Sequence, residues 1–155
     1  VMLGYWNNKK ETDKVLKDGW LYTGDIGEFE NSFLKITDRK KDIIITPGGD
    51  NISPVKIENN LLKSNFIEQA LVYGDNKPYL VSLIVLPNDK KDLINEKIFE
   101  EIEKINKNLS KIEKIKKFIV IKDQFSIENS MLTPTLKLKR YKIIKKYKNE
   151  LEKLY

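Results

Sequence analysis

Three short polar segments of this 155-residue sequence carry side chains that could handle a nucleotide. Residues 23–25, Thr-Gly-Asp, place a carboxylate at a glycine turn, where it could accept two hydrogen bonds from neighbouring ribose hydroxyl groups. Arg39 opens a run of charged residues, and its forked guanidinium suits a ribose or a phosphate. Lys137 follows a stiff Thr-Pro-Thr segment and could bring positive charge to an anion that develops during a reaction. We therefore predict one nucleotide-handling site to which three segments contribute.

Asp25 and Arg39 each have a purely structural alternative. Asp25 could be an ordinary turn residue. Arg39 could form a surface ion pair with Asp38 or Asp42. The local sequence alone favours these alternatives, because turn carboxylates and surface ion pairs are common.

Gly48-Gly49 and Lys137 are equally open to two interpretations. The two glycines could let a ligand approach the backbone closely, or they could simply form a hairpin turn. Lys137 could be one more lysine on a lysine-rich surface. The sequence contains neither of the glycine-rich phosphate-binding patterns, GxxxxGK[ST] and GxGxxG.

The residue types that are absent limit the chemistry. The sequence has no cysteine and no histidine, so it offers no disulfide framework, no thiolate or imidazole metal site and no Ser-His or Cys-His nucleophile. Catalysis must therefore use Asp, Glu, Lys, Arg or Tyr, and we predict no metal site within these residues. No apolar run approaches the roughly 18–20 residues of a membrane-spanning helix.

Charge is distributed unevenly along the chain. Residues 1–88 carry a net charge of −1, whereas residues 89–155 carry +7. A basic half favours partners that bear phosphate, such as a nucleotide, a nucleic acid or an anionic lipid. The alternative is an ordinary solvated surface in a lysine-rich protein.

The first two functional residues should lie in a small antiparallel unit. Residues 1–18 resemble an arm with a short helix over 11–17, for which Thr12 is a possible cap. Strands are predicted at 21–23, 26–30 and 33–37. Residues 38–42 are five consecutive charged residues between apolar segments, so we place a domain boundary there.

The remaining elements should form an α+β domain. A hairpin of strands 43–45 and 51–52 surrounds the Gly48-Gly49 turn. The further predictions are a helix from Ser53-Pro54 to about Ser64, strands 67–73 and 79–86, a helix 92–107, a capping box Ser110–Glu113 opening a short helix, a strand 118–121 and a helix 139–155. The inward residues predicted for the helices are Val55, Ile57, Leu61, Leu62, Leu93, Ile98, Ile102, Ile105, Tyr141, Ile144, Tyr147, Leu151 and Leu154. The expected fold class is thus a small mixed or antiparallel sheet packed with about four helices, preceded by a short β-hairpin unit.

Taken together, three motifs resemble those of the adenylate-forming, AMP-binding superfamily of acyl-CoA synthetases, luciferases and peptide-synthetase adenylation domains. They are residues 19–25 (GWLYTGD), residues 38–54 (DRKKDIIITPGGDNISP) and residues 132–140 (LTPTLKLKR). The last is similar to the long-chain acyl-CoA synthetase form of the motif. The resemblance covers essentially the whole chain, with the motifs in the right order and at the right separations.

The resemblance implies a domain plan. Residues 1–37 would be the last piece of a large N-terminal adenylation domain, 38–42 a hinge, and 43–155 the small mobile C-terminal domain. Most of the active site, including the fatty-acid tunnel and the ligands of Mg²⁺, would then belong to the N-terminal domain. The fragment alone is expected to be inactive.

The resemblance also implies residue roles on the nucleotide side. Asp25 would bind the ribose hydroxyl groups of AMP, with help from Arg39. Lys41 matches the hinge position, about which the small domain would rotate between two half-reactions.

Further roles are implied for the small domain. Lys137 would bridge the fatty carboxylate and the α-phosphate of ATP during adenylation. Gly48 and Gly49 would lie beside the CoA tunnel after rotation. Other subfamilies have glycine where this chain has Leu136, which leaves Lys139 as an alternative to Lys137. The Lys-x-x-Arg spacing to Arg140 favours Lys137.

The implied partners are ATP, fatty acid, CoA and the protein's own N-terminal domain, with AMP as a product and Mg²⁺ accompanying ATP. The implied location is the cytoplasm or the cytosolic face of an intracellular membrane, with peripheral membrane contact as an option. No targeting segment is recognised in the sequence.

Two other functions stay open. One is a basic module that binds nucleic acid or an anionic membrane, although no nucleic-acid motif is present and the aromatic residues fall on apolar stripes. The other is an adenylating enzyme with a different acyl substrate, such as an aryl acid or an amino acid. A purely structural role has no specific support.

Overall fold

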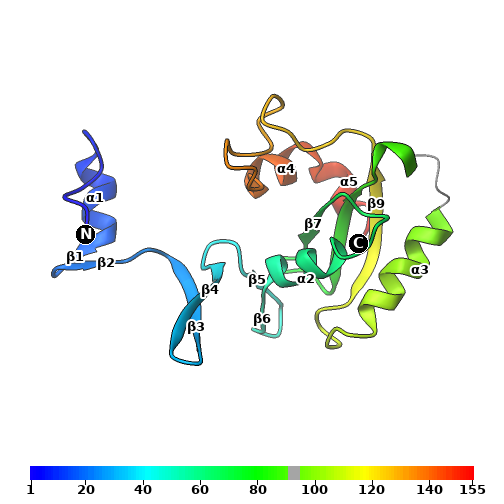
Figure 1. Cartoon of the computed structure of the whole chain (residues 1–155), viewed down its shortest axis with the longest axis horizontal. Helices are drawn as coiled ribbons and strands as arrows, with labels where there is room; N and C mark the ends of the chain where they lie inside the picture. Colours follow the sequence, from blue (N-terminus) through cyan, green and yellow to red (C-terminus); the bar gives the residue numbers. More distant parts are fainter. Residues whose placement is uncertain (91–94) are drawn as a thin grey trace. The chain divides into compact units, whose positions relative to one another are not determined.

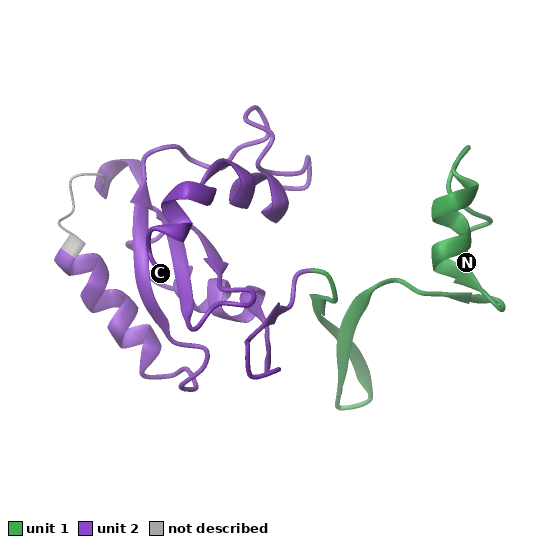
Figure 2. Ribbon diagram, turned by 180° about the vertical axis from the view of Figure 1, so that it is seen from behind, with its two compact units in different colours: residues 1–41 green, residues 42–155 purple. Residues whose placement is uncertain are grey.

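The computed structural model describes residues 1–90 and 95–155. The described chain separates into two compact units, residues 1–41 and 42–155 (Figure 2). The division falls between Lys41 and Asp42. The role of residues 38–42 as a hinge stays a prediction, because the division into two units does not describe a rotation between them.

The first unit begins with α1, Lys9–Val15. Its N-cap is Asn8, whose side-chain oxygen accepts the Glu11 N–H at 3.1 Å. The predicted cap, Thr12, lies inside the helix, and its hydroxyl donates to the Asn8 carbonyl at 2.9 Å. The prediction of Thr12 as the cap is therefore wrong, because the helix starts earlier than expected.

Two antiparallel strand pairs follow α1. The strands are β1 Leu16–Lys17, β2 Trp20–Leu21, β3 Asp25–Glu30 and β4 Phe33–Arg39. β1 pairs with β2, and β3 pairs with β4 across the Asn31-Ser32 turn, where both residues have positive φ. The predicted β3–β4 hairpin is confirmed, and β4 extends two residues into the charged run. The strand predicted at 21–23 is wrong in its bounds, because β2 ends at Leu21.

The second unit is a three-layer α+β domain (Figure 1). Its central sheet contains β7 Gln69–Tyr73, β8 Leu80–Val85 and β9 Ile115–Ile121, in the order β7-β8-β9. β7 pairs with β8 antiparallel, and β9 joins β8 in parallel, so the sheet is mixed. The other elements are β5 Ile44–Ile45, β6 Asn51–Ile52, α2 Pro54–Leu61, a 3-10 turn η1 Asn88–Lys90, α3 Asn95–Asn106, α4 Arg140–Lys146 and α5 Lys148–Glu152. The predicted fold class is confirmed.

Both faces of the central sheet are buried. Leu80 and Ile84 of β8 point into a cluster formed with α2 and α3, whereas Leu83 and Val85 point into a second cluster formed with α4 and α5. Every residue of β8 is buried. Successive side chains of a strand point to opposite faces of the sheet, so a central strand between two helical layers needs residues that can be buried on both faces.

The start of α2 is as predicted, but its end is not. The Ser53 hydroxyl accepts the Lys56 N–H at 3.1 Å, and Pro54 occupies the first helical position. The helix ends at Leu61, three residues before Ser64. Leu62 therefore lies past the last turn and is exposed rather than inward.

The predicted short helix after Ser110 does not form. Glu113 does accept the Ser110 N–H at 3.1 Å, as a capping box requires, but only a turn results. The reason lies in Asn106, whose buried side-chain amide exchanges two 2.9 Å hydrogen bonds with the backbone of Ile115. This pairing starts β9 at Ile115, three residues earlier than predicted.

The C-terminal helix is two helices, with a break at Tyr147. The buried stripe is Ile143, Tyr147 and Leu151, with Ile144 partly buried. Tyr141, predicted to point inward, is 68% exposed. Ile143 takes its place because residues four apart lie above one another on a helix. The predicted inward residue Leu93 lies outside the described residues.

No helix in the described part of the chain is both long enough and apolar enough to cross a membrane.

Candidate functional site

Asp25 and Arg39 lie opposite each other in the β3–β4 register. The Arg39 Nε donates to Asp25 Oδ1 at 2.8 Å. Of the alternatives considered for Arg39, the ion pair is present, but its partner is Asp25 rather than Asp38 or Asp42. The pairing holds a carboxylate and a guanidinium side by side at one end of the hairpin.

The Thr23-Gly24 turn fixes this carboxylate. The Thr23 hydroxyl accepts the Asp25 N–H at 3.0 Å, and the Gly24 carbonyl accepts the Lys40 N–H at 2.8 Å. Gly24 has φ +73°, a left-handed conformation that glycine adopts without strain. The glycine is thus needed for the turn itself.

Arg39 also lines a pocket of about 520 Å³ in the first unit. The pocket walls include the aromatic rings of Trp6 and Tyr22, the Thr23-Gly24 turn and the hinge candidate Lys41. A pocket lined by aromatic, arginine and lysine side chains can bind a base and a phosphate or ribose.

In the second unit, the Gly48-Gly49 turn joins β5 to β6 as a closed hairpin. The Thr46 hydroxyl donates to Asp50 Oδ2 at 3.0 Å and accepts the Asp50 N–H at 3.1 Å. Gly49 has φ +87°, so a side chain there would be strained, whereas Gly48 has ordinary backbone angles. The hairpin interpretation is therefore sufficient to explain Gly49, and close approach by a ligand stays a prediction.

A basic pocket of about 550 Å³ lies beside the glycine turn, and sequence reasoning missed it. Gly48 and Asp50 form one side, and Pro78, Tyr79 and Ile112 contribute apolar surface. Four lysines converge on it: Lys77, Lys111, Lys114 and Lys116. The signal in the sequence was the run KIEKIKK at 111–117, which the early start of β9 brings next to the 77–80 turn. Four ammonium groups around partly apolar surface suit a ligand with several phosphates.

One of these lysines has a carboxylate partner. The Lys77 ammonium donates to Glu152 of α5, and this hydrogen bond raises the pKa of Lys77 and lowers the pKa of Glu152. The ion pair connects one wall of the pocket to the C-terminal layer of the domain.

Residues 132–138 form a tight loop, and Lys137 lies at its base, one residue before Leu138. Leu132 and Leu138 pair across its base as an antiparallel bridge. The Thr133 N–H donates to the Lys137 carbonyl at 2.8 Å, and the Lys137 N–H donates to the Thr133 hydroxyl at 3.0 Å. The Thr-Pro-Thr segment thus closes the loop on itself and holds the Lys137 backbone in place.

The side chain of Lys137 is exposed. Within the described residues, no hydrogen bond or ion pair engages its ammonium group. Lys139, by contrast, is partly buried and is the N-cap residue of α4. Lys137 is therefore the lysine of this loop that can reach outward.

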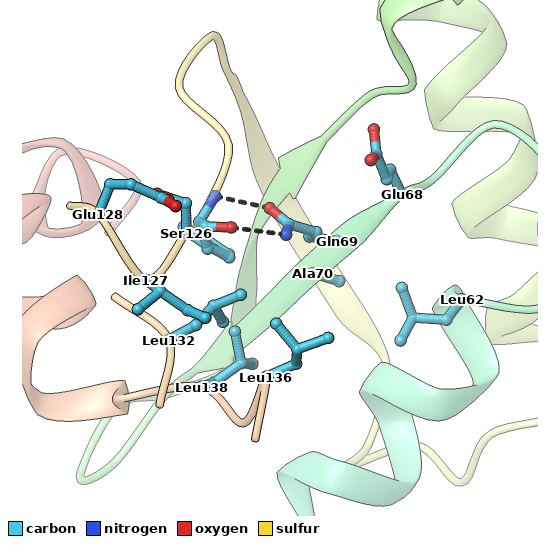
Figure 3. A pocket seen from close by; sticks show the side chains of 11 residues that line it. Leu62, Glu68, Gln69, Ala70, Ser126, Ile127, Glu128, Leu132, Leu136 and Leu138 are labelled. Atoms are coloured by element: carbon cyan, nitrogen blue, oxygen red, sulfur yellow. Dashed lines mark hydrogen bonds between the residues drawn. The ribbon is translucent and has the colours of Figure 1, made fainter. Parts of the chain in front are cut away.

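The backbone conformation of Leu136 is one that favours glycine. Its φ is +59°, a region that costs a leucine conformational energy. The side chain is 69% exposed and borders an apolar groove of about 490 Å³. Figure 3 shows Leu62, Leu132 and Leu138 among the residues that line the groove. The Gln69 side chain, which also lines it, donates to the Phe125 carbonyl and accepts the Phe125 N–H.

Comparison with known proteins gives consistent matches over this chain. Residues 41–155 match the family described as "AMP-binding enzyme C-terminal domain". Long-chain-fatty-acid–CoA ligase FadD15 of Mycobacterium tuberculosis is 36% identical over 178 aligned residues, which cover 100% of this chain and 30% of that protein. Long-chain-fatty-acid–CoA ligase 5 of Mus musculus is also 36% identical, over 100% of this chain and 26% of that protein. The chain thus spans about a third or less of the curated relatives it matches.

Solved structures of adenylation domains also match this chain. The adenylation domain of a carboxylate reductase from Mycobacterium chelonae superposes with a TM-score of 0.89 at 28% identity, over 99% of this chain and 26% of that one. An adenylation–carrier didomain of the carboxylic acid reductase from Segniliparus rugosus, in complex with AMP, gives a TM-score of 0.88 at 26% identity, over 100% of this chain and 23% of that one.

Proposed function

Since the chain belongs to the family of AMP-binding enzyme C-terminal domains, we propose that it is the C-terminal part of an ATP-dependent long-chain fatty acid–CoA ligase. The names of its curated relatives support the substrate class. The observation that carries the proposal is the Lys137 loop, which presents an exposed ammonium group on a backbone closed by its own hydrogen bonds.

Lys137 would act in the first half-reaction. A fatty carboxylate oxygen attacks the α-phosphorus of ATP, the bond to pyrophosphate breaks, and an acyl-adenylate forms. An ammonium group between the two anions lowers their repulsion and stabilises the charge that develops on the α-phosphate. The unpaired state of Lys137 supports this role, because no ion pair of its own has to be broken first.

Asp25 and Arg39 would hold the adenosine part of the substrate. Asp25 can accept from both ribose hydroxyl groups, as a carboxylate has two oxygens. Arg39 already lies beside it at 2.8 Å, and the adjoining aromatic pocket can cover a base. The two residues would thus keep AMP in place through both half-reactions.

The glycine turn and the basic pocket would serve the second half-reaction, in which the CoA thiol attacks the acyl carbonyl carbon and AMP leaves. CoA carries phosphate groups on its nucleotide end. Lys111, Lys114 and Lys116 beside Gly48 offer the complementary charge, whereas the charge of Lys77 is balanced by Glu152. Rotation about Lys41 would withdraw the Lys137 loop from the active site and bring the Gly48-Gly49 face to it, a movement of the hinge type.

The remaining parts of the site would lie in the N-terminal domain. No group of three or more acidic side chains among the described residues could hold a metal ion. By resemblance to the family, the ligands of the Mg²⁺ that accompanies ATP would belong to the N-terminal domain. Mg²⁺ would neutralise phosphate charge there, while the residues of this chain position the nucleotide and the carboxylate.

The test is product formation by the full-length protein. With ATP, CoA and a long-chain fatty acid, the expected products are acyl-CoA, AMP and pyrophosphate. Benzoate and free amino acids serve as control substrates, and a preference for either would contradict the fatty-acid assignment. The 155-residue chain alone is expected to show no fatty-acid-dependent pyrophosphate exchange, and measurable exchange would show that the site is not mostly elsewhere.

A further inference from the structure

A buried ion pair lies close to the Lys137 loop. Arg140 donates through Nη2 to both carboxylate oxygens of Glu58, and their side chains are only 11% and 7% exposed. Arg140 is the first residue of α4, and Glu58 lies in the middle of α2. The pair therefore joins helices from opposite layers of the domain (Figure 1).

The same pair engages the free edge of the central sheet. The Val72 N–H donates to Glu58 Oε1 at 2.7 Å, and Arg140 Nη1 donates to the Val72 carbonyl at 3.3 Å. Within the described sheet β7 pairs only with β8, so these backbone groups would otherwise lack a strand partner. Glu58 and Arg140 thus replace the missing strand at this point.

Among the described residues, no side chain caps the start of α4. Asn8 caps α1 and Ser53 caps α2, whereas the N-cap of α4, Lys139, makes no side-chain capping hydrogen bond. The backbone contributes the bond from the Lys139 N–H to the Met131 carbonyl at 2.8 Å. Arg140 is consequently the side chain that fixes where α4 begins.

Lys137 lies three residues before this anchor. Its loop is closed internally by Thr133, but those bonds tie the loop only to itself. The direction in which the loop leaves the domain depends on the Leu132–Leu138 base and on Arg140. A catalytic ammonium group displaced by about 1 Å can lose on the order of a hundredfold in rate.

We propose that Arg140 and Glu58 are positioning residues for Lys137: their buried pair on Val72 sets the place of the lysine loop and so governs the adenylation step. Neither residue touches the substrates. The guanidinium is suited to this task because its planar fork donates to the carboxylate and to the Val72 carbonyl at once, which a lysine ammonium group cannot match in direction. This inference rests on the proposed role of Lys137.

The kinetic test uses the full-length enzyme with Arg140→Lys and Glu58→Gln. Acyl-adenylate formation in single turnover is expected to fall roughly 10–100-fold, and thioester formation from supplied acyl-adenylate is expected to stay within about threefold. Lys146→Gln is the matched control, since Lys146 lies in the same helix and forms an exposed ion pair with Asp123. It should leave both steps unchanged.

A double-mutant cycle separates positioning from a purely structural role. In a Lys137→Ala background, Arg140→Lys should have little further effect on adenylation, because the group it positions is gone. Parallel loss of both half-reactions, together with a lower melting temperature, would overturn the proposal. Full additivity of the two substitutions would overturn it as well. Should Arg140→Lys fail to fold, Glu58→Gln carries the same test, because glutamine still accepts the Val72 N–H.

Hydrogen exchange on the 155-residue chain tests the inference independently of activity. The amides of Leu136, Lys137 and Lys139 are hydrogen-bonded, and in Arg140→Lys they should exchange roughly tenfold faster or more, with Leu83 of β8 as the unchanged reference. Unchanged exchange at these amides would contradict the proposal. If the parent enzyme forms no acyl-adenylate, the proposed function fails and the exchange result alone decides the positioning inference.

Discussion

The two units differ in how they bury apolar surface. In residues 42–155, β8 is buried along its whole length between two helical layers. All of residues 1–41 are described, and none of their apolar side chains is buried, although β3 and β4 pair along their length with one register shift between Ile26 and Gly27. The large apolar side chains left exposed there are Val1, Leu3, Tyr5, Trp6, Trp20, Tyr22, Ile26, Phe29, Phe33, Leu34 and Ile36. Strand pairing without a core is marginally stable in water, so the first unit needs further apolar surface to cover it.

This difference matches the division of labour that we propose. The second unit can act as a rigid body because its core is its own, so Lys137 and the basic pocket keep fixed positions within it. The first unit holds the Asp25–Arg39 pair on a hairpin whose exposed aromatic residues fit the interior of a larger domain.

The strongest way to break the comparison is to separate the units. Residues 42–155 alone should unfold cooperatively in urea, since both of their core clusters remain intact. Residues 1–41 alone should show no cooperative transition. Circular dichroism at increasing urea concentrations measures both. A cooperative transition in residues 1–41 would show that the hairpin unit is stable without a covering surface.

Replacing a large apolar side chain by alanine should change the unfolding free energy much more in the second unit than in the first. Leu83→Ala in β8 removes a fully buried side chain and should cost about 2–5 kcal/mol of unfolding free energy. Phe33→Ala in β4 removes a larger side chain that is 78% exposed, and should cost less than about 0.5 kcal/mol. Urea unfolding of the 155-residue chain gives both values. Equal costs would mean that the exposed hairpin is packed in solution.

A left-handed position from each unit offers a smaller test. Gly24 in the first unit has φ +73°, and Leu136 in the second has φ +59°. Leu136→Gly should therefore stabilise the chain by about 0.5–1 kcal/mol, because the leucine strain outweighs the entropy that glycine adds to the unfolded state. Leu136→Ala keeps the strain and is the control. A loss of stability in Leu136→Gly would indicate that the Leu136 side chain contributes packing in the apolar groove.

The smallest expected effect concerns two ion pairs. Hydrogen bonds from Lys56 and Ser110 hold the pKa of Glu113 below its usual value of 4.5. A lowered carboxyl pKa in the folded state stabilises the fold above that usual value, and the contribution is lost as the pH falls through the folded-state pKa. Because Lys56 is well exposed, the effect should be about 1 kcal/mol or less.

The check is the unfolding free energy of Glu113→Gln at pH 7 and pH 3.5. The variant should lose part of the wild-type dependence on pH in this range. Glu30→Gln in the first unit breaks the exposed pair with Lys35 and should leave that dependence unchanged. A larger effect from Glu30 than from Glu113 would reverse the comparison.

Local signals were sufficient for much of the fold. The Ser53-Pro54 start of α2, the hairpin around Gly48-Gly49 and the β7–β8 pair depend on neighbouring residues, and their patterns predicted them. The early start of β9 was missed because it depends on the side-chain amide of Asn106 pairing with the backbone of Ile115, which no periodicity indicates. The break at Tyr147 was also missed.

The same distinction holds for the candidate site. The segments that carry Asp25, Arg39 and Lys137 could be recognised because each is a short motif. The contact of Arg140 with Glu58 joins residues 82 positions apart, and no local sequence pattern predicts it. The basic pocket was missed for the same reason, since it needs the 77–80 turn and the 111–116 segment in one place.

The most direct test of the central claim is a comparison of the two half-reactions in the full-length Lys137→Ala enzyme. Acyl-adenylate formation should fall by on the order of a hundredfold or more, because the ammonium group that we propose to lie between the carboxylate and the α-phosphate is removed. Transfer of the acyl group from supplied acyl-adenylate to CoA should change by less than about threefold. Lys139→Ala should leave adenylation close to the wild-type rate. Equal loss of both steps in Lys137→Ala, or an adenylation step that Lys139 rather than Lys137 controls, would contradict the account.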